Sequence, residues 1–251
     1  MIRHNGLYVF WHFVFESLAY LAAFRLYVWQ RQRSGDFLET GTRWTVIVAA
    51  IAGAAFGSKF LYWLEDPVRT AHEWSNPEYL LAGKTIVGAL LGGTIAVELV
   101  KKRSGIRRRT GDLFALPLAI GIAIGRIGCF LAGTEDGTYG NPTGLPWGVD
   151  LGDGVRRHPV QLYEIAAMLM LAIFLRRVHP PRYAEGDRFR VFVLAYYSWR
   201  LLVDFLKPGF RFGGMTTLQW ACACAVLWYS RDLWRMMRSS AKPKEELAHV
   251  R

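Results

Sequence analysis

The stretch 113–132 reads LFALPLAIGIAIGRIGCFLA and carries one charged side chain, Arg126, in twenty residues. About 20 apolar helical residues cross a hydrocarbon core of ~30 Å. The whole chain of 251 residues has this character, because 52% of it is hydrophobic and its charges gather in short segments between apolar ones. These patterns predict an all-α integral membrane protein and exclude disordered and collagen-like chains.

Six further apolar stretches bring the expected number of transmembrane helices to about seven. The expected spans cover residues 7–28, 44–64, 85–100, 113–132, 160–175, 191–206 and 215–230. We expect the first to be retained, because no small-residue cleavage site follows it. The chain is therefore predicted to form a single polytopic membrane domain over residues 1–251.

The basic residues between these spans predict the orientation of the chain. Alternate segments are rich and poor in Lys and Arg, with 21 basic residues in one set and seven in the other. By the positive-inside rule, the N-terminus is periplasmic and the C-terminus, with a tail at 236–251, is cytoplasmic. Polybasic loops beside anionic lipid headgroups also explain the net charge of +11, so no nucleic-acid partner is expected.

Three basic residues, Lys59, Arg126 and Arg200, fall inside the expected spans. A charge there costs at least ~2.5–3.5 kcal/mol, so each side chain needs a partner or a polar cavity. One interpretation is internal ion pairs, with Arg200 paired to Asp204 one turn later and Arg126 paired to an acid such as Glu98. The other is an anion site, because the guanidinium fork suits phosphate and stays charged at low dielectric.

Glycine spacing carries two further predictions. Pairs four residues apart, at 53 and 57, 88 and 92, and 121 and 125, indicate close helix packing. The stretch 125–164 holds nine of the 25 glycines and includes the Gly/Pro-rich loop 133–158, expected to be periplasmic. Such a loop brings backbone N–H groups to an anion, covers a site as a mobile lid, or simply connects two helices. The polar helix faces next to this loop are expected near the outer surface of the membrane. A site formed between them would therefore open towards the outer leaflet.

Three blocks in this order resemble the prolipoprotein diacylglyceryl transferase family. They are GRIGCFLAG at 125–133, HPVQLYE at 158–164, and the series Tyr196, Arg200 and Asp204 in a later span. The resemblance implies an enzyme of the bacterial inner membrane that moves the diacylglyceryl group of phosphatidylglycerol to a cysteine thiol, releasing glycerol phosphate. The acceptor would be the lipobox cysteine in the signal peptide of a prolipoprotein. Membrane lipids are the other implied partners, and no cofactor is implied.

The resemblance also implies site residues. Arg126 and Arg200 match two essential arginines of the family, the first of which contacts phosphate, and both are expected to be catalytic. With these two, the expected substrate-binding residues are Gly128, Cys129, Gly140, Gln161, Glu164 and Asp204.

The chain departs from the usual family pattern at several positions. Where typical members have His-Gly-Gly, it reads Ile-Val-Gly-Ala-Leu at 86–90, so that histidine is missing. Cys129 replaces an asparagine, which resembles a variant branch with further cysteines where this chain has Thr134 and Glu135. Lys59 stands where arginine is usual.

Several residues are candidates for the proton acceptor in the reaction. His158, expected at the outer mouth, has a suitable pKa and is our predicted catalytic histidine, although the HPxQLYE motif is equally typical of a helix start. Glu164 would serve either as a base or as a hydrogen-bonding tie between helices. Cys129 would be either a nucleophile activated by Arg126 or a small buried residue. Three other positions are too weakly marked to rank: His12, Gln219 and Asp112.

The three cysteines, at 129, 222 and 224, support neither a disulfide framework nor a metal knuckle, so no metal site is predicted. Two alternative functions remain open at this point. One is a non-catalytic binder or transporter of anionic lipid, and the other is a related lipid transferase with a different acceptor.

Overall fold

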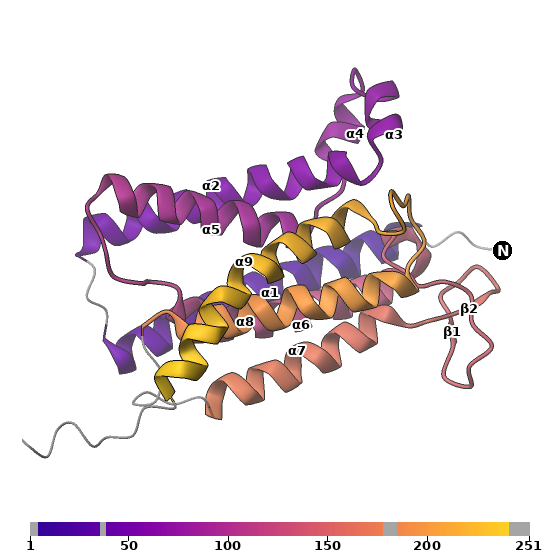
Figure 1. Cartoon of the computed structure of the whole chain (residues 1–251). Helices are drawn as coiled ribbons and strands as arrows, with labels where there is room; N and C mark the ends of the chain where they lie inside the picture. Colours follow the sequence, from indigo (N-terminus) through magenta and orange to yellow (C-terminus); the bar gives the residue numbers. More distant parts are fainter. Residues whose placement is uncertain (1–4, 36–38, 178–184, 241–251) are drawn as a thin grey trace, which may run out of the picture.

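The computed structural model describes residues 5–35, 39–177 and 185–240. Within these ranges, seven long helices lie on the seven predicted stretches, and shorter elements join them (Figure 1). The long helices are α1 (Asn5–Ser34), α2 (Thr40–Glu65), α5 (Ile86–Arg103), α6 (Asp112–Ala132), α7 (Val160–Arg177), α8 (Asp187–Val203) and α9 (Thr217–Ser240). The shorter elements are α3 (Pro67–His72), α4 (Pro77–Leu81), the 3₁₀ turns η1 (Gly133–Asp136) and η2 (Asp204–Leu206), and the strands β1 (Val149–Asp150) and β2 (Arg156–Arg157).

The outer surface of the bundle is apolar. Among the described residues, two helices, Thr40–Glu65 and Asp112–Asp136, are long and apolar enough to cross a membrane by length and composition. Large apolar side chains such as Phe13, Phe56 and Trp228 are about two-thirds exposed, on three different helices. Exposed apolar side chains on this scale mark a surface that contacts a membrane or a partner. The fold is thus mostly helical and of the kind expected for a membrane protein.

The connections gather at the two ends of the bundle (Figure 1). One end holds the start of α1, the α3–α4 segment, the β1–β2 hairpin and the connection between α8 and α9. The connection between α5 and α6 lies at the opposite end. The segments poor in Lys and Arg therefore share one end, as the predicted alternation requires. Helix α9 continues to Ser240, into the predicted tail, and residues 241–251 of that tail lie outside the described residues.

Helix α6 is central, because it packs against α1, α7 and α8. Pro117 lies inside this helix and has no N–H to donate to the carbonyl of Leu113. The side chain of Gln30, from α1, donates to that carbonyl at 3.3 Å. The contact satisfies the backbone group that proline frees and fixes α1 against the start of α6.

The predicted glycine packing is confirmed where α2 meets α5. A Cβ added at Gly57 would lie 2.4 Å from the carbonyl oxygen of Gly88, and one added at Gly92 would lie 2.2 Å from that of Gly53. The two backbones therefore approach too closely for any side chain. The third pair is looser, since a Cβ at Gly121 would lie 3.3 Å from Ala23 of α1.

Gly92→Ala should lower the stability of the protein by about 1–3 kcal/mol, because the added methyl group separates α2 from α5. Thermal unfolding in detergent measures the effect. Gly41→Ala is the matched control, since nothing lies within 4 Å of a Cβ at Gly41. Equal melting temperatures for the two variants would contradict the packing.

The predicted loop 133–158 is not an unstructured connector. It forms η1 and then a hairpin in which β1 pairs antiparallel with β2. Arg157 donates from Nε and Nη2 to one oxygen of Asp153, at 2.8 and 2.7 Å, which holds the pKa of Asp153 below its usual value. The N–H of Asn141 donates to the carbonyl of Leu206 at 2.7 Å. The loop is thus joined to η2, beside the end of α8.

Candidate functional site

Three helices bring charged side chains together inside the bundle: Arg126 from α6, Glu164 from α7 and Arg200 from α8. All three are buried, with at most 7% of each residue exposed. Arg126 Nε lies 2.8 Å from Glu164 Oε2, and Arg200 Nη1 lies 3.2 Å from the same oxygen. One carboxylate therefore holds both guanidinium groups.

Two further charged side chains extend this cluster. The predicted pair of Arg200 and Asp204 is confirmed, with 2.8 Å between Nη2 and Oδ1. Lys207, which the sequence did not single out, lies 3.8 Å from the same oxygen of Asp204. Burial, and then the positive charges of Arg200 and Arg126, lower the pKa of Lys207 to about 8. The ion-paired groups are three basic and two acidic side chains, and Glu65 of α2 is a further carboxylate within electrostatic reach.

Gln161 lies one turn before Glu164 on the same face of α7, and it is 1% exposed. Neither its amide oxygen nor its amide nitrogen has a hydrogen-bond partner in the described part of the chain. Leaving a buried polar group unpaired costs about 1–3 kcal/mol, and such groups are rare in native proteins. A polar ligand beside Gln161 would satisfy the amide.

The contacts of Glu164 favour one of its two predicted roles. Its Oε1 accepts from Arg126 Nη2 and from the hydroxyl of Tyr196, both at 3.3 Å. With Oε2 also occupied, the carboxylate acts as a tie between helices and not as a free proton acceptor. The expected pairing of Arg126 with Glu98 is wrong, because Glu98 pairs with Lys101 at 2.7 Å near the other end of the bundle.

His158 lies just before α7, outside the arginine cluster. Its Nδ1 is 3.4 Å from the hydroxyl of Tyr163, and a Cβ at Gly140 would lie 2.4 Å from its carbonyl oxygen. Within the described residues, no hydrogen bond or ion pair joins His158 to Arg126 or Arg200. Its catalytic role therefore stays a prediction, as does substrate binding by Gly140.

The remaining predicted positions fall in different places. Cys129 is buried, and its Sγ lies 3.6 Å from Arg126 Nη1, next to the cluster. Gly128 faces α1, since a Cβ there would lie 2.9 Å from Cβ of Phe15. Lys59 donates to the backbone carbonyl groups of Ala82 and Gly83, just after α4, at 2.7 and 2.8 Å.

Comparison with known proteins identifies the family of the chain. The family described as prolipoprotein diacylglyceryl transferase matches residues 1–231. Three relatives are named phosphatidylglycerol-prolipoprotein diacylglyceryl transferase. The protein of Clostridium tetani is 34% identical, over 64% of this chain and 66% of its own length. That of Campylobacter hominis is 33% identical, over 80% and 76%, and that of Bordetella bronchiseptica is 30% identical, over 90% of both. The chain therefore belongs to the prolipoprotein diacylglyceryl transferase family.

Proposed function

We propose that this protein transfers the diacylglyceryl group of phosphatidylglycerol to the lipobox cysteine in the signal peptide of a prolipoprotein, releasing glycerol phosphate. The observation that carries the proposal is the pair of buried arginines, Arg126 and Arg200, held on the one carboxylate of Glu164. The names of the relatives supply the two substrates.

The arginine pair suits a phosphodiester donor. Guanidinium groups bind phosphate oxygens through charge-assisted hydrogen bonds and stay protonated when buried. The Nε of Arg200 makes no hydrogen bond within the described part of the chain, so it is available to an anion. Gln161 offers a second unused donor from α7. These groups would bind the phosphate of the donor lipid.

The same groups would stabilise the departing phosphate. The acceptor sulfur attacks a glycerol carbon, the bond from that carbon to the phosphate oxygen breaks, and the electron pair leaves with glycerol phosphate. Negative charge therefore increases on the phosphate oxygens as the bond breaks. Preorganised donors in a water-poor site stabilise such charge by about 3–4 kcal/mol each. Lys207 adds a third positive charge beside Asp204.

We also propose that all seven long helices span the bacterial inner membrane, with the site towards the outer leaflet. Arg126, Glu164 and Arg200 each lie within about two turns of the helix end that carries the β1–β2 hairpin. That end holds the segments poor in Lys and Arg, which the positive-inside rule assigns to the periplasm. A lipid of the outer leaflet would thus reach the arginines.

The proposed orientation predicts the behaviour of reporter fusions. A reporter active only in the cytoplasm should function when fused after Arg251 and fail when inserted at Gly144, which is exposed in the loop before β1. A reporter active only in the periplasm should give the reverse pattern. Cytoplasmic activity at Gly144 would contradict the orientation.

The transferase reaction is tested with the purified full chain, phosphatidylglycerol and a synthetic lipobox peptide. We expect release of glycerol phosphate and a matching gain of one diacylglyceryl group by the peptide. A peptide with serine in place of the cysteine is the matched control and should stay unmodified. Lipid retained without release would indicate the lipid binder, and release without modification of the lipobox peptide would indicate a transferase with another acceptor.

A further inference from the structure

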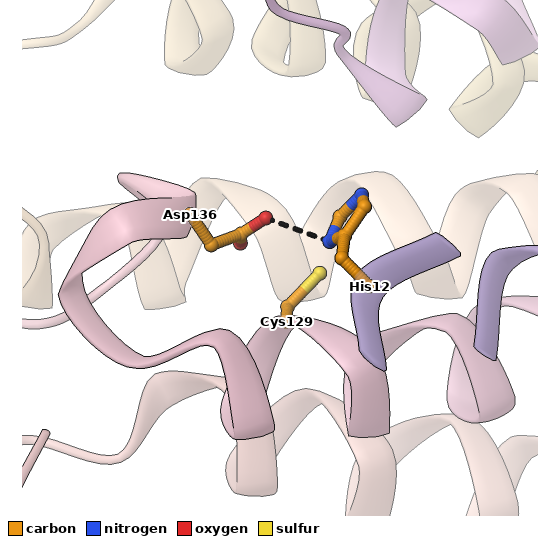
Figure 2. Close-up of side chains that lie close together, drawn as sticks. All are labelled: His12, Cys129 and Asp136. Carbon is orange, nitrogen blue, oxygen red and sulfur yellow. Dashed lines mark ion pairs between the residues drawn. The ribbon is translucent and has the colours of Figure 1, made fainter. Parts of the chain in front are cut away.

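Three side chains with different metal-binding atoms meet where α1, α6 and η1 come together. His12 belongs to α1, Cys129 to α6 and Asp136 to η1. One ligand atom from each lies within 4.8 Å of the other two, and His12 Nδ1 is 3.0 Å from Asp136 Oδ1. Figure 2 shows the sulfur of Cys129 and the carboxylate of Asp136 both directed towards the same edge of the His12 ring.

His12 and Asp136 form an ion pair when the ring is protonated, but the contact does not have the geometry of a hydrogen bond. The Nδ1 atom of His12 is buried, yet it makes no hydrogen bond of acceptable geometry within the described residues, despite the short distance to Asp136. Buried ring nitrogens are normally hydrogen-bonded or bound to a metal. The sulfur of Cys129 is also buried and faces the same space. A cation placed between the three atoms would satisfy all of them.

Neighbouring side chains are arranged as in the outer shell of a metal site. The other ring nitrogen of His12, Nε2, lies 3.8 Å from a carboxylate oxygen of Glu16, which itself pairs with Lys84. The hydroxyl of Thr138 donates to the second oxygen of Asp136. Metal-bound histidines almost always donate their other N–H to a carboxylate or carbonyl group, which fixes the ring. Glu16 is placed to take this role, at 3.8 Å from Nε2 and slightly beyond hydrogen-bond distance.

The ligand atoms select the kind of metal. One imidazole nitrogen, one thiolate sulfur and one carboxylate oxygen form a set that suits Zn²⁺, which binds each of them at about 2.0–2.3 Å. Two anionic ligands also balance the charge of a divalent cation. Three protein ligands are typical of catalytic zinc sites, in which the fourth position is left for water or substrate.

We propose that His12, Cys129 and Asp136 bind Zn²⁺ and that its fourth position takes the thiol of the acceptor cysteine. The second part rests on the proposed transferase function. Cys129 lies 3.6 Å from Arg126, so the metal would adjoin the donor phosphate. Within the described residues, the two carboxylates that contact the arginine pair, Glu164 and Asp204, are ion-paired to it, and His158 lies apart, so the acceptor thiol needs another means of losing its proton.

The reaction needs no reactant other than the acceptor thiol, the donor lipid and water. A thiol bound to zinc at this site would be deprotonated, and its proton would pass to water beside His12, about a third of whose side chain is exposed. The sulfur forms a bond to the glycerol carbon while the bond from carbon to phosphate oxygen breaks. The electron pair leaves on that oxygen, so a thiolate and a phosphodiester monoanion give a neutral thioether and a phosphomonoester dianion.

Metal binding is tested on the full chain, purified in detergent without chelators and supplied with Zn²⁺ or Co²⁺. We expect stoichiometric Zn²⁺ by elemental analysis, and with Co²⁺ the visible bands of a four-coordinate site together with a sulfur-to-cobalt absorption. His12→Ala and Asp136→Asn should weaken Zn²⁺ binding at least tenfold, and Glu16→Gln about tenfold or more. Cys129→Ser should abolish the sulfur-to-cobalt absorption.

Matched controls stand elsewhere in the chain: Cys224→Ser, His72→Ala and Asp153→Asn should leave metal content unchanged. Absence of metal from the parent protein would overturn the proposal, whether or not any variant folds. Equal metal content in the control and ligand variants would also overturn it. That result would leave His12 and Asp136 as a simple ion pair between α1 and η1.

The acceptor position is tested separately from metal binding. A lipobox peptide added to the Co²⁺-loaded protein should strengthen the sulfur-to-cobalt absorption, and the same peptide with serine should not. No difference between the peptides would overturn the acceptor position. Turnover that survives complete removal of metal would refute the zinc role while the transferase function stands. Bound metal without any glycerol phosphate release would support the metal site and refute the transferase function.

Discussion

Arg126→Gln is expected to lower glycerol phosphate release by about 10²–10³-fold while the protein remains folded. The loss follows from removing one preorganised donor at the phosphate, which costs this much in other enzymes that stabilise a developing negative charge. Stability should change little, because Glu164 still has Arg200 and the hydroxyl of Tyr196 as partners. No charged group is therefore left buried without a partner.

Two further variants make this result specific. Arg126→Lys keeps the charge but loses the planar fork, so it should recover only a small part of the lost activity. Arg69→Gln, on the exposed helix α3, removes an arginine from the same end of the molecule and should leave the rate unchanged. A folded Arg126→Gln variant that releases glycerol phosphate at the parent rate would refute the donor role of Arg126.

The sequence predicted features that depend on spacing along one helix. Seven apolar stretches predicted the seven long helices, because a run of about 20 apolar residues is a strong local pattern. The pairing of Arg200 with Asp204 followed from four-residue spacing, which places both side chains on one face. The contact of α2 with α5 agrees with glycine spacing, since glycine pairs indicate close approach before the partner helix is known.

Contacts between helices were beyond what spacing predicts. Nothing in the sequence indicates that Glu164 joins Arg126 to Arg200, because the contact requires the packing of three helices. For the same reason Glu98 was a reasonable but wrong partner for Arg126. The sequence alone does not rank His12, because its neighbours Cys129 and Asp136 lie far along the chain, although the family resemblance marks the cysteine as unusual.

Glu164→Gln should destabilise the protein by about 3–5 kcal/mol, the largest stability effect that we expect from a single substitution in this site. Removing one partner of a buried ion pair leaves an uncompensated charge, and here one carboxylate serves two guanidinium groups. Arg200 keeps Asp204 as a partner, whereas Arg126 retains only its weak contact with the sulfur of Cys129. Thermal unfolding in detergent measures the loss.

The melting temperature of Glu164→Gln in the presence of the donor lipid is a second test of this site. If the arginines bind a phosphate, phosphatidylglycerol should raise the melting temperature of Glu164→Gln more than that of the parent, because the phosphate replaces the missing negative charge. A neutral lipid of the same chain length should have no such effect. Glu185→Gln is the matched control, since Glu185 and its partner Arg108 are 51% and 55% exposed and exposed pairs contribute only about 0–1 kcal/mol. Equal stability of the two glutamine variants would show that Glu164 does not hold the arginines. If Glu164→Gln is destabilised but responds equally to both lipids, the arginines bind the carboxylate alone. That result would refute phosphate binding by Arg126 and Arg200.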